Sequence, residues 1–206
     1  MCPKDCVLAQ WSNWSACKWE GGDNQKAYRK SRTRTITNRE VGNGVSCGLF
    51  SLEESDACPI DWNDYLAKCP LEPNTLIIEG GCYLFSDKKK NYNDAKSFCE
   101  SKFAVNGKTG RLVEPKTTTI NKLIYENAKT IFGASFDYLI GVNDISNENS
   151  WVYSSTGLPA TTMFDSGQPN DGTKANCIYI GTSCANAFEN WCDGTCTTHY
   201  GIVCEF

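Results

Sequence analysis

Residues 167–196 hold side chains whose types and spacing suggest chemistry. The stretch reads GQPNDGTKANCIYIGTSCANAFENWCDGTC and mixes amide and carboxylate oxygens with four cysteines. Oxygens of these two kinds are the ligands that Ca²⁺ takes in proteins, about six to eight at a time. The stretch therefore contains candidate ligands for a calcium ion.

Catalytic chemistry has little support in the rest of the chain. His199 is the single histidine, and no cysteine or serine is arranged to work with it. A nucleophilic or acid–base enzyme needs such partners within hydrogen-bond reach. We therefore predict a binding protein and not an enzyme.

Composition sets the expected compartment. The 206 residues include 13 cysteines without the CxxC pairs of a zinc site, so we expect disulfides, which persist outside the cytosol. The net charge of -4 argues against a nucleic-acid partner, and no run reaches the ~18 apolar residues of a membrane span. Because of the expected disulfides, we predict a secreted or cell-surface protein. No apolar signal sequence opens the chain, so we expect that its signal peptide has been removed.

The elements that could position these groups fall into two modules that meet near residue 60. The first has almost no helical periodicity, but Lys30, Arg32 and Arg34 alternate with Ser and Thr. A strand places all three cations on one face, where Trp11 and Trp14 can stack between them for roughly 0.5–2 kcal/mol per contact. Such a stack and disulfides would replace the apolar core that so short a module lacks.

This module resembles a thrombospondin type 1 repeat, which we place at residues 2–60. The resemblance is carried by WSNWSAC from Trp11, by RTR from Arg32 and by GNGVSCGLFSLEESDAC. It implies a small, elongated, disulfide-rich three-stranded domain with C-mannosylation at Trp11 and Trp14. The segment KWEGG lacks the usual Cys-Gly, and with it the O-fucose motif. The implied disulfides are Cys6–Cys47 and Cys17–Cys58.

Cys2 is left over from that pairing. Its partner is either missing at the chain end or lies in a second molecule, because an odd cysteine in a secreted protein often pairs between chains. The second reading predicts a homodimer. A short, stiff junction is expected at residues 61–68, because CPIDWNDYLAKCP contains no Gly/Ser linker.

The second module alternates strand and helix patterns. An aromatic strand is expected at 83–85, then a helix capped by Asn91 or Asn93, and a second helix that can start at Pro115. Four further strands are predicted in DYLIGVND, SWVYSSTG, NCIYIG and HYGIVCEF.

This module resembles a C-type lectin-like domain over residues 69–206, through the YLIGV strand, QPN, WCD and the cysteine positions. The resemblance implies an α+β fold with two helices, antiparallel sheets and a long loop region. It also implies the pairs Cys69–Cys82, Cys99–Cys204 and Cys177–Cys196. The remaining Cys184 and Cys192 would add a bridge inside the binding loop.

Sugar-binding members of that family hold one calcium ion at a primary site beside a cis proline, and this ion also binds two sugar hydroxyls. The matching residues here are Gln168, Asn170 and Asp193, next to Trp191. The positions of the other two ligands carry Ala175 and Cys192, so calcium affinity is expected at the weak, ~millimolar end. Asp171, Glu189 or Asn190 could compensate if the loop is rearranged.

An auxiliary calcium site of the family maps to Asp144, Glu148 and Asp171, with Asn176 in place of a further carboxylate. On charge alone this site outranks the primary one. The alternative is that NDISNEN is simply a polar turn.

The resemblances together predict a secreted lectin that recognises glycans with calcium, in adhesion or innate defence. QPN matches neither the EPN of mannose-type sites nor the QPD of galactose-type sites, so the sugar class stays undecided. The alternative is a metal-independent adhesion protein with a vestigial sugar site, binding protein or sulfated polysaccharide. Lys88, Lys89 and Lys90 could serve such a polyanion together with the cations of the first module.

Overall fold

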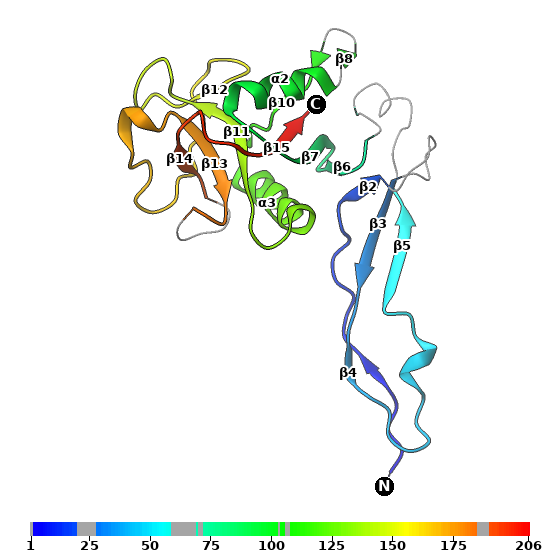
Figure 1. Cartoon of the computed structure of the whole chain (residues 1–206). Helices are drawn as coiled ribbons and strands as arrows, with labels where there is room; N and C mark the ends of the chain where they lie inside the picture. Colours follow the sequence, from blue (N-terminus) through cyan, green and yellow to red (C-terminus); the bar gives the residue numbers. More distant parts are fainter. Residues whose placement is uncertain are drawn as a thin grey trace. The chain divides into compact units, whose positions relative to one another are not determined.

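The computed structural model describes residues 2–19, 28–58, 69, 72–102, 104–105, 108–184 and 190–206. The junction expected at 61–68 lies outside these residues. The chain divides into two compact units, Met1–Trp62 and Asn63–Phe206 (Figure 1). Over the described residues, no helix combines the length and apolarity needed to cross a membrane.

The first unit contains two small antiparallel sheets. Strand β3 (Tyr28–Thr33) lies between β2 (Cys17–Trp19) and β5 (Glu53–Ala57). Strand β1 (Val7–Leu8) pairs with β4 (Ile36–Asn38), and the 3-10 turn η2 (Cys47–Leu49) precedes β5.

Three cations and two tryptophan rings stack along this unit. The Lys30 ammonium lies 4.9 Å from the centroid of the Trp14 ring. The Arg32 guanidinium lies between both rings, 4.6 Å from Trp14 and 5.1 Å from Trp11. Arg34 closes the stack 4.2 Å from Trp11. This is the arrangement that the alternation of basic residues predicts, because alternate residues of a strand share a face.

Six disulfides are present among the described residues. Five join the partners that the two resemblances imply, and the sixth joins the two cysteines that remained in the binding loop. Each bond lies within one unit, and Cys2 is an exposed free cysteine. The pairs are Cys6–Cys47, Cys17–Cys58, Cys69–Cys82, Cys99–Cys204, Cys177–Cys196 and Cys184–Cys192.

In its described residues, the second unit combines two α-helices with a sheet and a long loop region. In chain order its elements are β6 (Thr75–Ile78), β7 (Gly81–Lys90), α2 (Tyr92–Lys102), β8 (Ala104–Val105), β9 (Lys108–Thr109), β10 (Arg111–Leu112), α3 (Thr118–Phe132), β11 (Asp137–Asn143), β12 (Val152–Tyr153), η3 (Gly172–Lys174), β13 (Cys177–Gly181), β14 (Cys192–Gly194) and β15 (Tyr200–Glu205).

The strands of the main sheet follow the order β14-β13-β11-β15-β7-β6, with β10 beside β15 and β12 beside β11. Strands β11 and β15 run parallel, whereas the other pairs are antiparallel. The expectation of antiparallel sheets is therefore wrong for this pair. A parallel pair needs a long crossover connection, and the chain between β11 and β15 supplies one.

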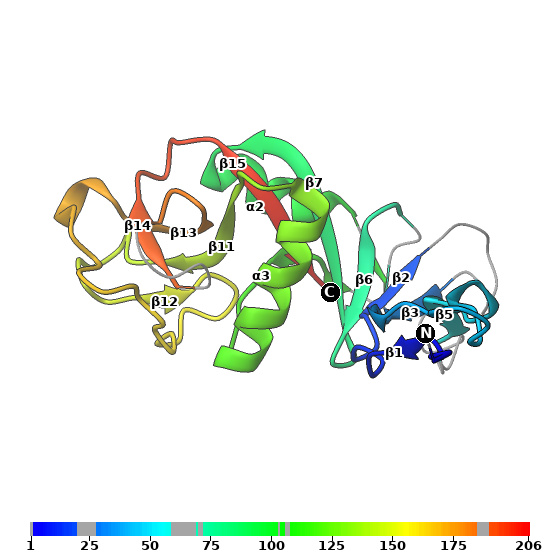
Figure 2. The same cartoon turned by 90° about the horizontal axis from the view of Figure 1, so that it is seen from below.

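The two helices pack against opposite faces of the sheet. Successive residues of a strand point to opposite faces, and two neighbours in β7 contact different helices. Leu84 of β7 belongs to the core cluster that contains Ala95 of α2. Its neighbour Phe85 faces the ring of Phe132 in α3, with centroids 6.2 Å apart. Figure 2 shows α3 in front of the strands and α2 behind them.

Side-chain caps set where the helices begin. The side-chain oxygen of Asn91 accepts a hydrogen bond from the Asp94 N–H at 2.9 Å, which makes Asn91 and not Asn93 the cap of α2. Helix α3 begins at Thr118, and the Thr117 hydroxyl caps it. The expected start at Pro115 is therefore wrong by three residues, because the Thr117 side chain accepts a hydrogen bond from the Ile120 N–H and fixes the helix end there.

Candidate functional site

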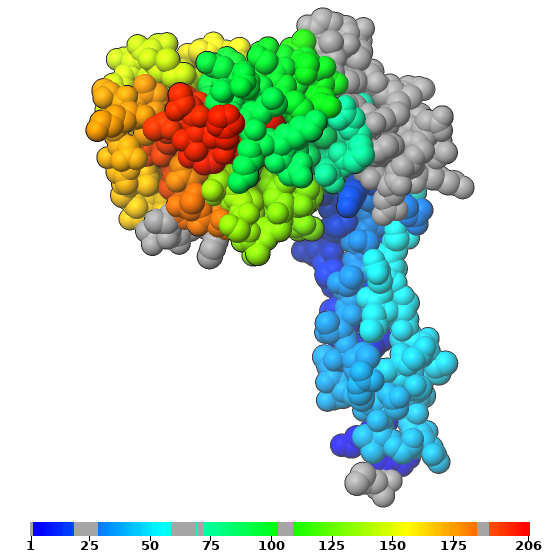
Figure 3. Space-filling view, in the orientation of Figure 1, coloured from blue at the N-terminus to red at the C-terminus, as the bar shows by residue number. Residues whose placement is uncertain are grey.

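The segment between β12 and β13 carries the predicted primary site. The peptide bond between Gln168 and Pro169 is cis. Pro169 and Asn170 are exposed, whereas Gln168 is half-buried. In Figure 3 the yellow to orange residues of this part of the chain form surface at one end of the second unit.

Asp193 of β14 holds this segment in place. Its side chain is buried, and its two carboxylate oxygens accept hydrogen bonds from the N–H groups of Asn170 at 3.1 Å and Asp171 at 3.0 Å. Hydrogen bonds to an ionised acceptor are roughly twice as strong as neutral ones. The protein itself therefore fixes the backbone that follows the cis proline, a role that the sequence does not reveal.

Three buried side-chain oxygens close to this segment in the chain or in space have no hydrogen-bond partner among the described residues. They are Asp144 Oδ1, Gln168 Oε1 and Asn176 Oδ1. Buried polar atoms are usually paired, and an orphan calls for an explanation such as a bound ion or water. Asn176 stands where the family pattern has a carboxylate. Its amide oxygen is nevertheless one of the three buried oxygens without a partner among the described residues.

Asp144 directly follows β11 and is only 2% exposed. Its Oδ2 accepts a hydrogen bond from the Asn149 N–H at 2.8 Å, and its own N–H donates to the Asn176 carbonyl at 3.2 Å. Burial, followed by the nearby charge of Asp193, raises the pKa of the Asp144 carboxyl. Both effects act against the charged form, and a bound cation would relieve them.

The residues of the auxiliary position fit a hard cation. The structure brings Asp144 and Asn176 together, each with an unpartnered buried oxygen. A Cβ placed on Gly172 would lie 4.0 Å from Oε1 of Glu148, so this carboxylate reaches η3 just beyond the exposed Asp171. All of these donors are oxygens, the class that Ca²⁺ prefers.

The primary position fits a cation less well. Both oxygens of Asp193 already accept N–H groups. Ala175 is 1% exposed and offers no donor, and Cys192 is fully buried in its bond to Cys184. The other side chains that offer oxygens there are Gln168 and Asn170, and both are uncharged amides.

Trp191 belongs to the core and not to a sugar platform. Its side chain is fully buried, and its indole Nε1–H donates to Asn121 Oδ1 of α3 at 3.0 Å. Its ring meets the edge of Phe164 with centroids 6.1 Å apart. The placement of Trp191 among the sugar-site residues is therefore not supported by its position.

Of the residues named as compensating ligands, the structure describes Asn190 and Asp171. The Asn190 amide donates to Asp165 at 3.4 Å, and Glu189 lies outside the described residues. Asp171 contributes its backbone N–H to Asp193, whereas its side chain is exposed.

Comparison with known proteins agrees with this fold and these motifs. Residues 88–206 match the family model described as Lectin C-type domain. The chain belongs to the C-type lectin domain family. The crystal structure of human lithostathine superimposes on it with a TM-score of 0.56 and 24% identity, covering 66% of this chain and 89% of that one, a likeness that concerns the fold.

Two relatives of this C-type lectin chain illustrate the range of similarity. A tetranectin-like protein of Carcharhinus perezii is 30% identical over 130 residues, which are 63% of this chain and 72% of that protein. A C-type lectin mannose-binding isoform of Oxyuranus scutellatus is 27% identical over 169 residues, covering 77% of this chain and 90% of the relative.

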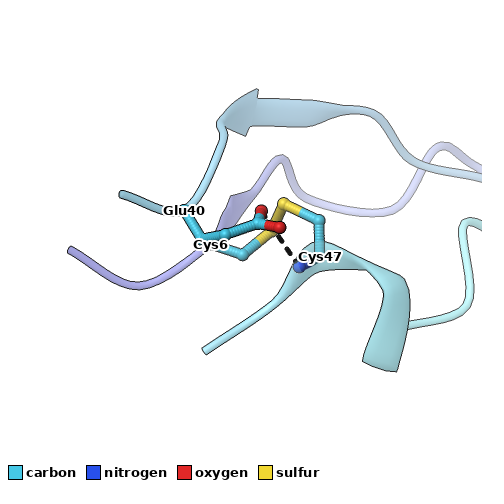
Figure 4. A group of neighbouring side chains, drawn as sticks. All are labelled: Cys6, Glu40 and Cys47. Carbon is cyan, nitrogen blue, oxygen red and sulfur yellow. Dashed lines mark hydrogen bonds between the residues drawn. A yellow bond between two sulfur atoms is a disulfide. The ribbon is translucent and has the colours of Figure 1, made fainter. Parts of the chain in front are cut away.

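Two other groups in this lectin chain bring a carboxylate against a pair of cysteines. In the first unit, Glu40 Oε2 accepts a hydrogen bond from the Cys47 N–H at 3.2 Å beside the Cys6–Cys47 bond (Figure 4). The second group joins Asp165 to the Cys184–Cys192 bond. Metals bind thiolates, and disulfide sulfurs are not thiolates, so both groups are structural.

Proposed function

We propose that the second unit is a carbohydrate-binding domain whose ligand contacts the exposed turn at Gln168, Pro169 and Asn170, with calcium supporting the site. Membership of the C-type lectin family supports this role, as does the name of the mannose-binding relative. The observation that carries the calcium part is the set of buried oxygens without a partner at Asp144, Gln168 and Asn176.

Calcium would be held by Asp144, Glu148 and Asn176, with Asp171 beside them. When bound, the ion supplies charge that pairs with buried carboxylate and offers coordination positions to oxygen ligands. Asp193 keeps the turn in shape through the N–H groups of Asn170 and Asp171. The exposed amide of Asn170 can donate and accept hydrogen bonds, which suits sugar hydroxyls.

Asp144→Asn tests the calcium site directly. The amide keeps an acceptor for the Asn149 N–H but removes the charge, so we expect calcium affinity to fall about tenfold or more. Calorimetric titration of the full chain with CaCl₂ measures this loss.

Asp56→Asn is the matched control, because Asp56 is an exposed carboxylate of β5 in the first unit. It is expected to leave calcium binding unchanged. Equal calcium affinity in Asp144→Asn and the unaltered chain would contradict the assignment.

A metal-independent binder is the second candidate. The observation that favours it is that both oxygens of Asp193 already accept loop N–H groups, together with Ala175 and Cys192 at two ligand positions. Glycan-array binding with and without EDTA separates the two candidates. Loss of binding in EDTA supports the calcium-dependent lectin, and unchanged binding supports the second candidate.

We further propose that the first unit is a thrombospondin type 1 repeat and that the protein is secreted and acts in adhesion or innate defence. The stack of Lys30, Arg32 and Arg34 with the two tryptophans supports the first point. The same stack weakens the case for sulfated polysaccharide there, because ring faces already cover the cations. A disulfide dimer through the exposed Cys2 stays a proposal that non-reducing electrophoresis tests.

A further inference from the structure

Two tyrosines form a stacked pair that neither the calcium positions nor the loop explains. The rings of Tyr179 in β13 and Tyr200 in β15 have centroids 4.7 Å apart and planes 11° from parallel. Both side chains are only half-buried. Aromatic rings favour such offset stacking, and this pair leaves part of its aromatic surface accessible.

The pair lies next to the strand that holds the candidate loop. In the ladder between β13 and β14, Ile178 pairs with Asp193 and Tyr179 pairs with Cys192. Asp193 in turn binds the N–H groups of Asn170 and Asp171. A short run of backbone therefore connects the tyrosine pair with the exposed turn.

Gly194 brings the rings close to that strand. A Cβ on Gly194 would lie 3.0 Å from Cδ1 of Tyr179 and 3.0 Å from the hydroxyl oxygen of Tyr200. Such distances are tighter than ordinary contacts, so a side chain here would push the rings outward. Because Gly194 has no side chain, both rings can pack closely against β14.

The exposed chemistry of the pair suits a sugar ring. A pyranose has one face made mainly of C–H groups, and an aromatic face carries negative charge density that attracts such hydrogens. Tyrosine is also a rigid contact residue that loses little conformational freedom on binding. An ordinary tyrosine phenol, with a pKa near 10, is already neutral at physiological pH, and burial raises the pKa of both of these groups further.

We propose that Tyr179, supported from behind by Tyr200, is a platform for a second sugar ring of a glycan whose first ring binds at the Gln168–Asn170 turn. This inference rests on the proposed function and adds to it a preference for glycans of two or more rings. The two parts of the site are joined by β14, with Asp193 facing the turn and Gly194 facing the tyrosines.

Paired one-ring and two-ring probes test the platform on the full chain. Methyl α-mannopyranoside and methyl β-galactopyranoside are the one-ring probes, and α-1,2-mannobiose and lactose are the two-ring probes. We expect Tyr179→Ala to lower affinity for the bound two-ring probe about five- to tenfold, the size of one aromatic contact. Affinity for the matching one-ring probe should change less than about twofold.

Three variants serve as controls. Tyr179→Phe keeps the ring and should retain two-ring affinity, whereas Tyr179→Leu keeps apolar volume and should not. Phe98→Ala removes another half-buried aromatic, from α2, and should leave the preference for two-ring probes unchanged. Aromatic NMR signals of Tyr179 in the unaltered chain should shift with the two-ring probe and not with its one-ring counterpart, which gives a readout that needs no variant.

The outcomes separate this inference from the function on which it rests. Binding of a probe with equal two-ring affinity in Tyr179→Ala, or with unmoved Tyr179 signals, overturns the platform and leaves the proposed function standing. If the unaltered chain binds no saccharide, with or without calcium, the proposed function fails and the platform fails with it.

Discussion

Single residues at the candidate site divide into those whose type reveals their role and those whose role depends on the path of the backbone. The carboxylate of Asp144 and the amide of Gln168 carry buried oxygens without partners, and their oxygen chemistry can be recognised in the sequence. Trp191 and Asp193 cannot be assigned in this way. An indole and a carboxylate can face a ligand or the interior equally well. Only the fold shows that Trp191 is buried and that its indole donates a hydrogen bond to Asn121.

Tyr200 gives a prediction that depends on pH. Burial, followed by its neighbour Tyr179, raises the pKa of Tyr200 to about 12, above the ordinary value near 10. Folding thus favours the neutral phenol, and the stability it contributes is complete below pH 10 and is lost as the pH rises from 10 through 12. In a titration of tyrosinate absorbance, Tyr200→Phe should remove one late-ionising phenol.

Tyr83 is the internal reference for that titration, because burial and then the charge of Glu205 also raise its pKa to about 12. Its late step should persist in Tyr200→Phe. A variant that instead loses a step near pH 10 would contradict the burial of Tyr200.

Secondary-structure features can be predicted from the sequence where they depend only on residues close together in the chain. The period of two in a strand places Lys30 and Arg32 on one face, and this is what the structure shows. The start of α3 at Thr118 and the parallel pairing of β11 with β15 are different. The first depends on which of several nearby residues caps the helix, and the second on a contact between segments far apart in the chain.

The cation–tryptophan stack predicts unequal effects of its members. Arg32 contacts both rings and pairs with Glu54 at 2.7 Å, whereas Lys30 contacts only Trp14 among the ring contacts of the described residues. We expect Arg32→Ala to destabilise the first unit by about 1–2 kcal/mol and Lys30→Ala by about 0.5–1 kcal/mol.

Urea unfolding followed by the indole NMR signals of Trp11 and Trp14 measures both losses in the full chain. Lys18→Ala, which removes an exposed lysine of β2, is the control and should cost less than about 0.5 kcal/mol. Equal losses for Arg32 and Lys30 would show that the rings do not bind Arg32 from two sides.

The whole molecule consists of two units whose disulfides each lie within one unit. The sequence predicts most of these pairs through the resemblance of its cysteine positions to those of the two families. The same resemblance leaves the primary calcium position open. There the surrounding motif is retained, but the ligand positions carry Ala175 and Cys192, and the use of Asp193 by the loop is invisible without coordinates.

Two disulfides of the second unit should differ in their effect on stability. Cys99–Cys204 spans 105 residues and Cys184–Cys192 spans 8. The chain-entropy model gives about 4–5 kcal/mol for the long loop and about 2–3 kcal/mol for the short one. Double Cys→Ser variants of each pair, compared by urea unfolding of the second unit, should show this order. The reverse order would mean that the native state, and not the unfolded chain, determines the effect.

The hydrogen bonds of Asp193 have a consequence for how this protein can diversify. They use main-chain N–H groups at positions 170 and 171, which every amino acid except proline possesses. Side chains at these two positions can therefore be exchanged while the path of the turn persists. Gene duplicates that keep Asp193 can therefore acquire new ligand specificities at this turn while the backbone keeps its fold.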